Sequence, residues 1–176
     1  MARRDPLANA ADLIRRVYAY VAYHLGDGPD AEDVTSEVFE RALRYRKSYD
    51  AARGEPMTWL IGIARRCIYD AVSRPEVEFG NQPDTSSAED LEGDAVQRLA
   101  VTAAVARLDE RSRDLVALRF GADLSARQIG EILGLKTNAV EVALHRTLAR
   151  LRPELESIRE EPVDPRSKHE RASGWA

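Results

Sequence analysis

The sequence predicts an all-α protein: two small helical domains joined by a flexible acidic linker, the C-terminal one a helix-turn-helix. Apolar residues recur every three or four positions through most of the chain, which is the period of an amphipathic helix. The alternating pattern of a half-buried strand does not persist anywhere. An acidic segment separates the two periodic halves, and a length of 176 residues suits one domain of common size or two small ones.

Three helices are predicted before the acidic segment. The apolar stripe of the first is Leu7, Ala11, Ile14, Tyr18, Val21 and Leu25. The sequence Gly-Asp-Gly-Pro over residues 26–29 ends it. The stripe of the second is Val34, Val38, Ala42, Tyr45 and Tyr49. A loop over roughly residues 48–56 precedes the third helix, which begins near Met57. Its apolar face is Leu60, Ala64, Cys67 and Ala71.

Residues 75–94 have the composition of a linker. They contain prolines and glycines, no basic residue, and seven acidic residues: Glu76, Glu78, Asp84, Glu89, Asp90, Glu92 and Asp94. Such a segment cannot bury enough apolar surface to form a core. The C-terminal tail, residues 157–176, has prolines, mixed charge and no periodicity, so it is predicted to be disordered.

Residues 124–152 are typical of a helix-turn-helix. Ser125 and Gln128 can form a capping box at the start of the first helix, and Gly134 ends it. Thr137 is predicted to cap the second helix. That helix has an apolar stripe that must pack inward, formed by Val140, Leu144, Leu148 and Leu151. Gly130 suits the point where the two helices approach closest.

The outward face of this second helix could enter the major groove of DNA, as a recognition helix does. The net charge of −4 opposes binding to nucleic acid. However, basic residues outnumber acidic ones in residues 51–74 and again in residues 124–152. This distribution predicts DNA as a partner, although an ordinary helical hairpin would share the caps and the stripe.

Composition argues against several other classes of protein. A single cysteine, Cys67, excludes an intramolecular disulfide, and its place on an apolar stripe predicts a core residue. The three histidines lack metal-ligand spacing, and no phosphate-binding loop or Ser/His/Asp pattern is present, so we expect no catalytic residue, metal or cofactor. Because the mean hydropathy is −0.44 and no long apolar run exists, we expect no membrane insertion and a cytoplasmic protein.

Three segments in order now resemble a known family. DAEDVTSEVFERALRYRKSYD is followed by PMTWLIGIARRCIYDAVSR, and, after the acidic segment, by LDERSRDLVALRFGADLSARQIGEILGLKTNAVEVALHRTLARLR. Together they resemble a bacterial RNA polymerase sigma factor of the extracytoplasmic-function (ECF) group of the sigma-70 family. The resemblance covers most of residues 7–152. It implies a region 2-like domain over residues 1–74, a linker over 75–94, a region 4-like domain over 95–156, and a tail over 157–176.

The resemblance also implies the function. A sigma factor binds core RNA polymerase, recognises promoter DNA and promotes transcription initiation, with no catalysis of its own. An anti-sigma factor is a further partner that the family often has. Two alternatives remain at this stage: a stand-alone helix-turn-helix transcription regulator, and a sigma mimic that binds an anti-sigma protein without DNA.

The resemblance assigns three sets of site residues. Those that match the polymerase-docking surface are Asp33, Glu37, Phe39, Arg41 and Arg44. Those that match the part contacting the minus-ten element are Arg53, Trp59, Arg65 and Arg66. Those expected at the minus-thirty-five element are Thr137, Asn138, Glu141, Val142, His145 and Arg146. The alternatives are a solvated charged helix for the first set, a core role for Trp59, and a phosphate or solvent contact for Arg146.

The chain departs from the family pattern at three places. After Ala71, where the family often has a cluster of arginines, the chain has only Arg74. Arg66 stands where the family often has an asparagine that reads a base. Residues 141–143, Glu-Val-Ala, stand where a basic-Ser-Arg triplet is common. Glu141 would therefore either repel phosphates or accept a hydrogen bond from cytosine, and the loss of cations lends weight to the sigma-mimic alternative.

Overall fold

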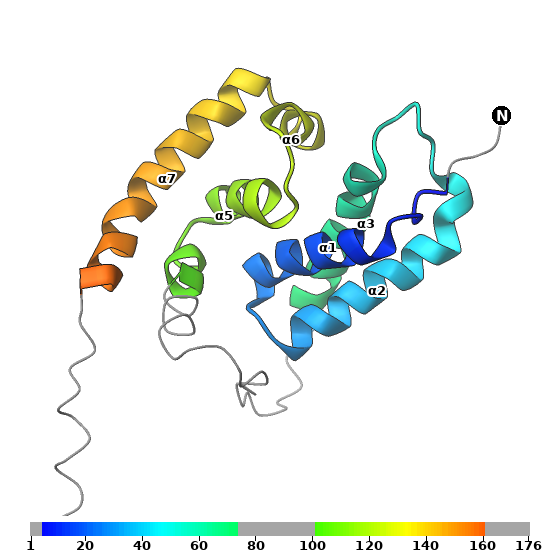
Figure 1. Ribbon diagram of the computed structural model, residues 1–176, viewed down its shortest axis with the longest axis horizontal. Helices are drawn as coiled ribbons and strands as arrows, with labels where there is room; N and C mark the ends of the chain where they lie inside the picture. The colour runs from blue at the N-terminus through cyan, green and yellow to red at the C-terminus, as the bar shows by residue number, and fades with distance from the viewer. Residues whose placement is uncertain (1–4, 74–100, 161–176) are drawn as a thin grey trace, which may run out of the picture.

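The computed structural model describes residues 5–73 and 101–160, and these residues form helices and connecting turns without any strand (Figure 1). The predicted all-α fold is thus confirmed. The predicted linker over residues 75–94 lies outside the described residues, as do residues 161–176 of the predicted tail. Residues 157–160, which we assigned to that tail, instead continue the last helix.

The N-terminal half contains three helices: α1 (Ala10–Leu25), α2 (Pro29–Tyr45) and α3 (Pro56–Val72). Gly26 and Gly28 have positive φ angles of 87° and 146°, which allows the tight turn between α1 and α2. A 3-10 turn, η1 (Arg46–Ser48), follows α2. Both α2 and α3 begin with proline, whose fixed φ and missing N–H suit the first helical position.

Most residues of the stripes predicted for α2 and α3 lie in the core of this half. The buried residues of the two stripes are Val34, Val38, Ala42, Leu60, Ala64 and Cys67. Burial raises the pKa of the Cys67 thiol, in keeping with its predicted core role. Tyr49, beyond the end of α2, and Ala71 are half-buried, and Tyr45, the last residue of α2, is 53% exposed.

The stripe predicted for α1 is only partly correct. Val21 is buried and Leu7, Tyr18 and Leu25 pack against the core, as predicted. Ile14 is 45% exposed and Ala11 is exposed, whereas Leu13, Val17 and Tyr20 are buried. The reason is that α1 is covered on two sides. It packs against α2 and α3 on one side and against the C-terminal half on the other, so the buried face is centred between these contacts.

The C-terminal half begins with a helical segment over residues 101–106, followed by α5 (Glu110–Val116). Asp109 caps α5 by accepting a hydrogen bond from the Ser112 N–H. A π-helical turn, η2 (Ala117–Gly121), continues it. The helix-turn-helix is then formed by α6 (Ala126–Leu133) and α7 (Thr137–Glu160), the long helix at the edge of the molecule in Figure 1.

The local signals of the helix-turn-helix are largely confirmed. Ser125 and Gln128 form the capping box, and Gly134 ends α6 in the left-handed conformation with φ 67°. Thr137 is the first residue of α7 and not the residue before it, so the cap position belongs to Lys136, whose carbonyl accepts from the Val140 N–H.

Gly130 is required by a close contact within the helix-turn-helix. A Cβ atom at this position would lie 2.5 Å from the carbonyl oxygen of Leu135, in the turn between α6 and α7. We expect Gly130→Ala to lower the free energy of unfolding of the full chain by about 1–3 kcal/mol, because backbone atoms would have to shift. Urea denaturation followed by circular dichroism measures this loss.

Gly62→Ala is the matched control for Gly130→Ala. Gly62 lies in the middle of α3, and an added Cβ would meet no atom within 4 Å. The exchange should raise stability by about 0.5–1 kcal/mol, because alanine loses less backbone entropy in a helix. A Gly130→Ala protein as stable as the wild type would contradict the close contact.

The two halves pack against each other in one continuous core. Its buried members include Val17 and Tyr20 from α1 and Leu118, Leu124 and Ile129 from the C-terminal half. The main contact joins α1 to η2, and a smaller one joins α3 to α6. The domains expected to be separate therefore touch along one side of α1.

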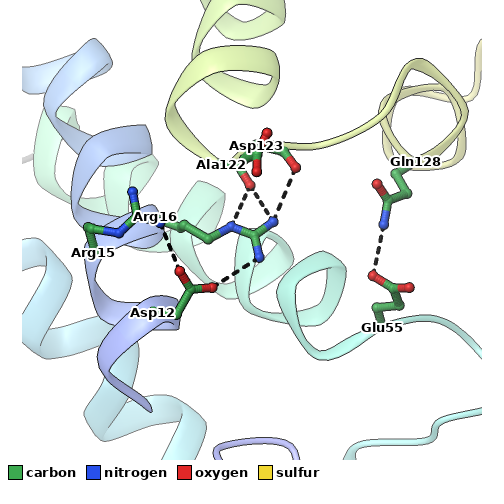
Figure 2. Close-up of polar contacts among 7 residues, drawn as sticks. All are labelled: Asp12, Arg15, Arg16, Glu55, Ala122, Asp123 and Gln128. Atoms are coloured by element: carbon green, nitrogen blue, oxygen red, sulfur yellow. Dashed lines mark hydrogen bonds and ion pairs between the residues drawn. The ribbon is translucent and has the colours of Figure 1, made fainter. Parts of the chain in front are cut away.

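Hydrogen bonds cross the same boundary. The guanidinium of Arg16 donates to the carbonyl of Ala122 over 2.9 and 2.7 Å and to that of Asp123 over 3.2 Å (Figure 2). Further along, the side-chain amide of Gln128 on α6 donates to the carboxylate of Glu55 over 2.9 Å (Figure 2). The start of α6 is thus tied to the loop that precedes α3.

Candidate nucleic-acid and polymerase interface

The first half of α7 presents an exposed polar face. Every residue that we assigned to the minus-thirty-five element is exposed there: Thr137, Asn138, Glu141, Val142, His145 and Arg146. Val140, Leu144 and Leu151 of the predicted stripe are buried on the opposite side. This exposed face has the geometry that a recognition helix needs to enter a major groove.

Leu148, the remaining member of the predicted stripe, is 38% exposed. It lies beside Phe120 at the end of η2, which is 52% exposed, and both line a shallow groove of about 430 Å³. Glu141 and His145 border the same groove. The buried face of α7 passes here through Thr147, which is 3% exposed, instead of Leu148.

A second exposed region surrounds the loop over residues 49–55. The rings of Tyr49 and Trp59 lie 5.5 Å apart in a tilted arrangement, and the Tyr49 hydroxyl donates to the carbonyl of Gly54 over 3.0 Å. Trp59 is half-buried against the core, so it contributes packing and also remains partly accessible. Arg53 on the loop and Arg66 on α3 are exposed.

Arg65 lies apart from these residues. Its guanidinium donates to the carboxylate of Asp114 on α5 over 2.7 Å, across the boundary between the halves. Arg65 therefore already has an anionic partner in this structure, whereas Arg53 and Arg66 are exposed and Trp59 is half-buried. The sequence analysis placed all four in one set, and the structure separates Arg65 from the other three.

Asp114, which joins the two halves, is a position that the sequence analysis missed. Its carboxylate accepts from the Tyr20 hydroxyl over 2.8 Å, and the Nε2 atom of His24 lies 3.5 Å away. All three partners, Arg65 included, belong to the N-terminal half. The available signal was an acidic residue within the otherwise apolar run DLVAL, since a carboxylate in an apolar helix face needs a partner.

The environment of Asp114 shifts the pKa values of this cluster. Burial by itself raises the pKa of the carboxyl, but His24, the positive charge of Arg65 and the Tyr20 hydroxyl outweigh it and hold this pKa below the ordinary 3.8. The pKa of Tyr20 is raised, first by burial and then by the negative charge of Asp114. Asp114 is therefore a carboxylate and Tyr20 a neutral donor at neutral pH.

The predicted docking residues on α2 fall into two groups. Asp33 and Arg44 are exposed and Glu37 is half-exposed, on one face of the helix. Phe39 packs against the core. Arg41 bridges α2 and α3, with contacts of 2.5 Å to Glu37 and 2.9 Å to Asp70 that raise its pKa.

Leu43 on α2 is 57% exposed, and it was not among the residues predicted to dock on the polymerase. An exposed leucine gives no signal by composition alone, because single apolar residues are common on protein surfaces.

Within residues 5–73 and 101–160, we find no group of side chains suited to hold a metal ion. No helix among these residues is long and apolar enough to cross a membrane.

Two protein-family models match the chain in the order of its two halves. Residues 10–76 match Sigma-70 region 2, and residues 98–151 match Sigma-70, region 4. The first spans α1 to α3 together with the loop over residues 49–55. The second spans α5, η2 and most of the helix-turn-helix.

Curated relatives give the same result. The ECF RNA polymerase sigma factor BldN of Streptomyces coelicolor is 34% identical over 149 residues, which cover 78% of this chain and 56% of that protein. The chain thus spans little more than half the length of BldN. The ECF RNA polymerase sigma factor SigW of Bacillus subtilis is 26% identical over 172 residues, covering 88% of this chain and 91% of SigW.

Two solved structures share the fold. CnrH, in complex with the cytosolic domain of CnrY, superposes with a TM-score of 0.57 at 20% identity and covers 84% of this chain and 82% of CnrH. The sigma factor RpoE of Bartonella quintana, in complex with the anti-sigma factor NepR, has a TM-score of 0.57 at 17% identity and covers 82% of this chain and 92% of RpoE.

Proposed function

Since the chain belongs to the sigma-70 family and to its ECF group, we propose that it binds core RNA polymerase, recognises promoter DNA and promotes transcription initiation. The observation that carries this proposal is the presence of region 2 and region 4 in one chain, in the family's order. The polymerase would supply the catalysis, in the cytoplasm, and this chain would supply binding surfaces. The two halves, residues 1–74 and 95–156, would be the two promoter-binding domains.

Each half contributes one DNA-binding surface to this proposal. The loop over residues 49–55 with Trp59 and Arg66 would receive an unstacked base of the minus-ten element, because an aromatic ring beside exposed cations favours stacking. The exposed face of α7 from Thr137 to Arg146 would enter the major groove at the minus-thirty-five element. Neither surface is strongly basic, so each would bind weakly alone, and the polymerase would hold both to the promoter.

Polymerase docking is proposed on the exposed face of α2. Asp33, Glu37 and Arg44 would make the contacts, whereas Phe39 and Arg41 would hold α2 against α3 and the core. An anti-sigma factor is a further proposed partner, since the solved structure of RpoE contains one.

Run-off transcription with purified core polymerase tests this function. The full chain should direct core polymerase to specific start sites and should leave duplex promoter DNA unprotected when it is alone. Tight, specific protection of duplex DNA by the free protein would favour a stand-alone regulator. Binding to an anti-sigma protein without any promoter-dependent transcript would favour a sigma mimic.

Glu141 provides a test of how α7 meets DNA. It is exposed on the face proposed to enter the groove, where a carboxylate either repels phosphates or accepts from cytosine. Under repulsion, we expect Glu141→Lys to strengthen binding to many promoters at low salt and to steepen the salt dependence by up to about 0.9 log units per new phosphate contact. Under direct readout, discrimination at one base pair should fall by about 1–3 kcal/mol.

The matched control is Glu156→Lys, an exposed exchange of the same charge further along α7 and beyond the proposed DNA face. It should leave both the salt slope and the base preference unchanged. If Glu141→Lys behaves like this control in polymerase-dependent promoter binding, α7 does not face DNA at residue 141.

A further inference from the structure

Val142 occupies the centre of the exposed face of α7. At about 100° of helix rotation per residue, it lies about 160° around the helix from the buried Val140 and Leu144, and about 180° from the buried Leu151. It is 42% exposed, and it is the one exposed large apolar side chain among residues 137–146, a stretch that the structure describes in full. The side chain that points most directly away from the protein is therefore apolar.

Polar side chains flank Val142 on the same face. Asn138 and Arg146, one turn before it and one turn after it, are both exposed. Glu141 lies about 100° to the side. Ala143 is half-buried and packs against the core, so it is turned away from this face. Of residues 141–143, the middle one is thus placed to face the base edges when α7 lies in a major groove.

The apolar groove on the C-terminal half does not account for the exposure of Val142. The groove is lined by Phe120, Leu144 and Leu148 among others, and Val142 is not one of its lining residues. Leu148 lies about 120° around α7 from Val142. A partner seated in this groove would therefore meet a different side of the helix.

An apolar side chain can detect one difference among the four bases. In the major groove, thymine presents its C5 methyl group, whereas adenine, guanine and cytosine present hydrogen-bond donors and acceptors. Valine cannot satisfy those polar groups, so covering them would cost free energy. Covering a methyl group removes apolar surface from water and is favourable. Because valine in a helix has essentially one χ1 rotamer, its two methyl groups are already in place before DNA binds.

We propose that Val142 selects a thymine in the promoter by contact with its C5 methyl group. This inference rests on the proposed function, whose sequence specificity it names. Asn138 lies about 6 Å from Val142 along the axis of α7, which corresponds to about two base-pair steps of about 3.4 Å. The selected thymine therefore lies within about two base pairs of the position that Asn138 contacts.

Base replacement tests this contact in the holoenzyme, the full chain bound to core polymerase. Promoters are first selected by the holoenzyme from a library randomised across the minus-thirty-five element. Each enriched thymine is then replaced by deoxyuridine, which removes the methyl group and keeps the base pair. At one position we expect promoter binding to weaken about four-fold, the effect of one buried methyl group.

Val142→Ser shows whether the valine detects this methyl group. The exchange removes two methyl groups from an exposed position, and serine and valine have similar helix propensity, so the melting temperature should be unchanged. The variant should bind the thymine and deoxyuridine promoters equally. Val72→Ser is the matched control, since it makes the same exchange at a 68% exposed valine on α3, and it should keep the four-fold difference.

A methyl group on a different base provides the reverse test. At the selected position, the wild type should bind a promoter with 5-methylcytosine more tightly than one with cytosine, because only the methyl group differs. Val142→Ser should bind these two promoters equally. Asn138→Ala should relax the base preference within about two base pairs of this position and leave the response to the methyl group intact.

The proposed contact and the proposed function fail in different ways. A holoenzyme that initiates at specific promoters but enriches no thymine, or that loses equal affinity with deoxyuridine in wild type and Val142→Ser, would overturn the contact alone. A full chain that gives no promoter-dependent transcript from any member of the library would instead refute the proposed function.

Discussion

Asp114→Asn is expected to weaken the contact between the halves by about 1–3 kcal/mol, the usual cost of leaving buried hydrogen-bonding groups without their partner. The side chain of Asp114 is only 13% exposed, and its contacts with Tyr20, His24 and Arg65 all cross the boundary. The side chain of Arg65 is 42% exposed, so water can replace part of the interaction with Asp114 that its guanidinium loses in the variant. Urea denaturation of the full chain measures the loss in free energy of unfolding.

The effect of Asp114→Asn should depend on pH. Because the folded-state pKa of Asp114 is held below 3.8, its contribution is present above the pKa of the unfolded carboxyl and is lost as the pH falls through the lowered folded value. The stability difference between wild type and Asp114→Asn should therefore be full at pH 7 and should shrink below about pH 4.

Asp109→Asn is the matched control for Asp114→Asn. Asp109 also has a lowered pKa, but its carboxylate accepts from the backbone of Ser112 and contacts Arg150, all within the C-terminal half. Asparagine caps helices as well as aspartate does, so this exchange should change stability little. Equal losses for both variants, or an Asp114→Asn loss that does not change with pH, would contradict the cross-boundary role.

Local sequence signals predicted the helix-turn-helix well because the groups that define it are close in the chain. The capping box of Ser125 and Gln128 and the left-handed Gly134 involve contacts over a few residues. Likewise, the stripes of α2 and α3 each face one partner, so their spacing determines which side is buried.

The packing between the halves could not be read from the sequence. It depends on Gly121 and Asp114 meeting residues of the N-terminal half that are far earlier in the chain, and neither residue type signals a distant partner. The burial of Leu13, Val17 and Tyr20 on α1 was missed for the same reason. Leu13, Val17 and Tyr20 form an equally periodic stripe, and only the second contact surface decides that this stripe is buried.

Some features of the candidate sites could likewise be predicted from the sequence, and others could not. Exposure of the α7 face follows from the burial of Val140 and Leu144 on its other side, so local periodicity was sufficient. Arg65 and Arg66 are neighbours with the same side chain, yet only Arg65 reaches Asp114. Sequence resemblance assigned them the same role because it carries no information on which of them has a partner across the boundary.

Trp59→Ala is expected to impair open-complex formation while binding to core polymerase is retained. Loss of a stacking platform costs about 1–3 kcal/mol per base, which is roughly a 5- to 150-fold decrease in open complexes. Trp59 also packs against the core and against Tyr49, so some loss of stability is expected as well. Promoter opening, core binding and thermal melting must therefore be measured on the same protein.

Two further variants separate stacking from packing. Ile63→Ala, one turn further along α3 and likewise half-buried against the core, should lower the melting temperature without impairing promoter opening. Arg66→Ala removes an exposed side chain from the same face as Trp59, so it should impair opening without lowering the melting temperature. If promoter opening instead follows the melting temperature across Trp59→Ala and Ile63→Ala, and Arg66→Ala has no effect, Trp59 is a core residue and the base is received elsewhere.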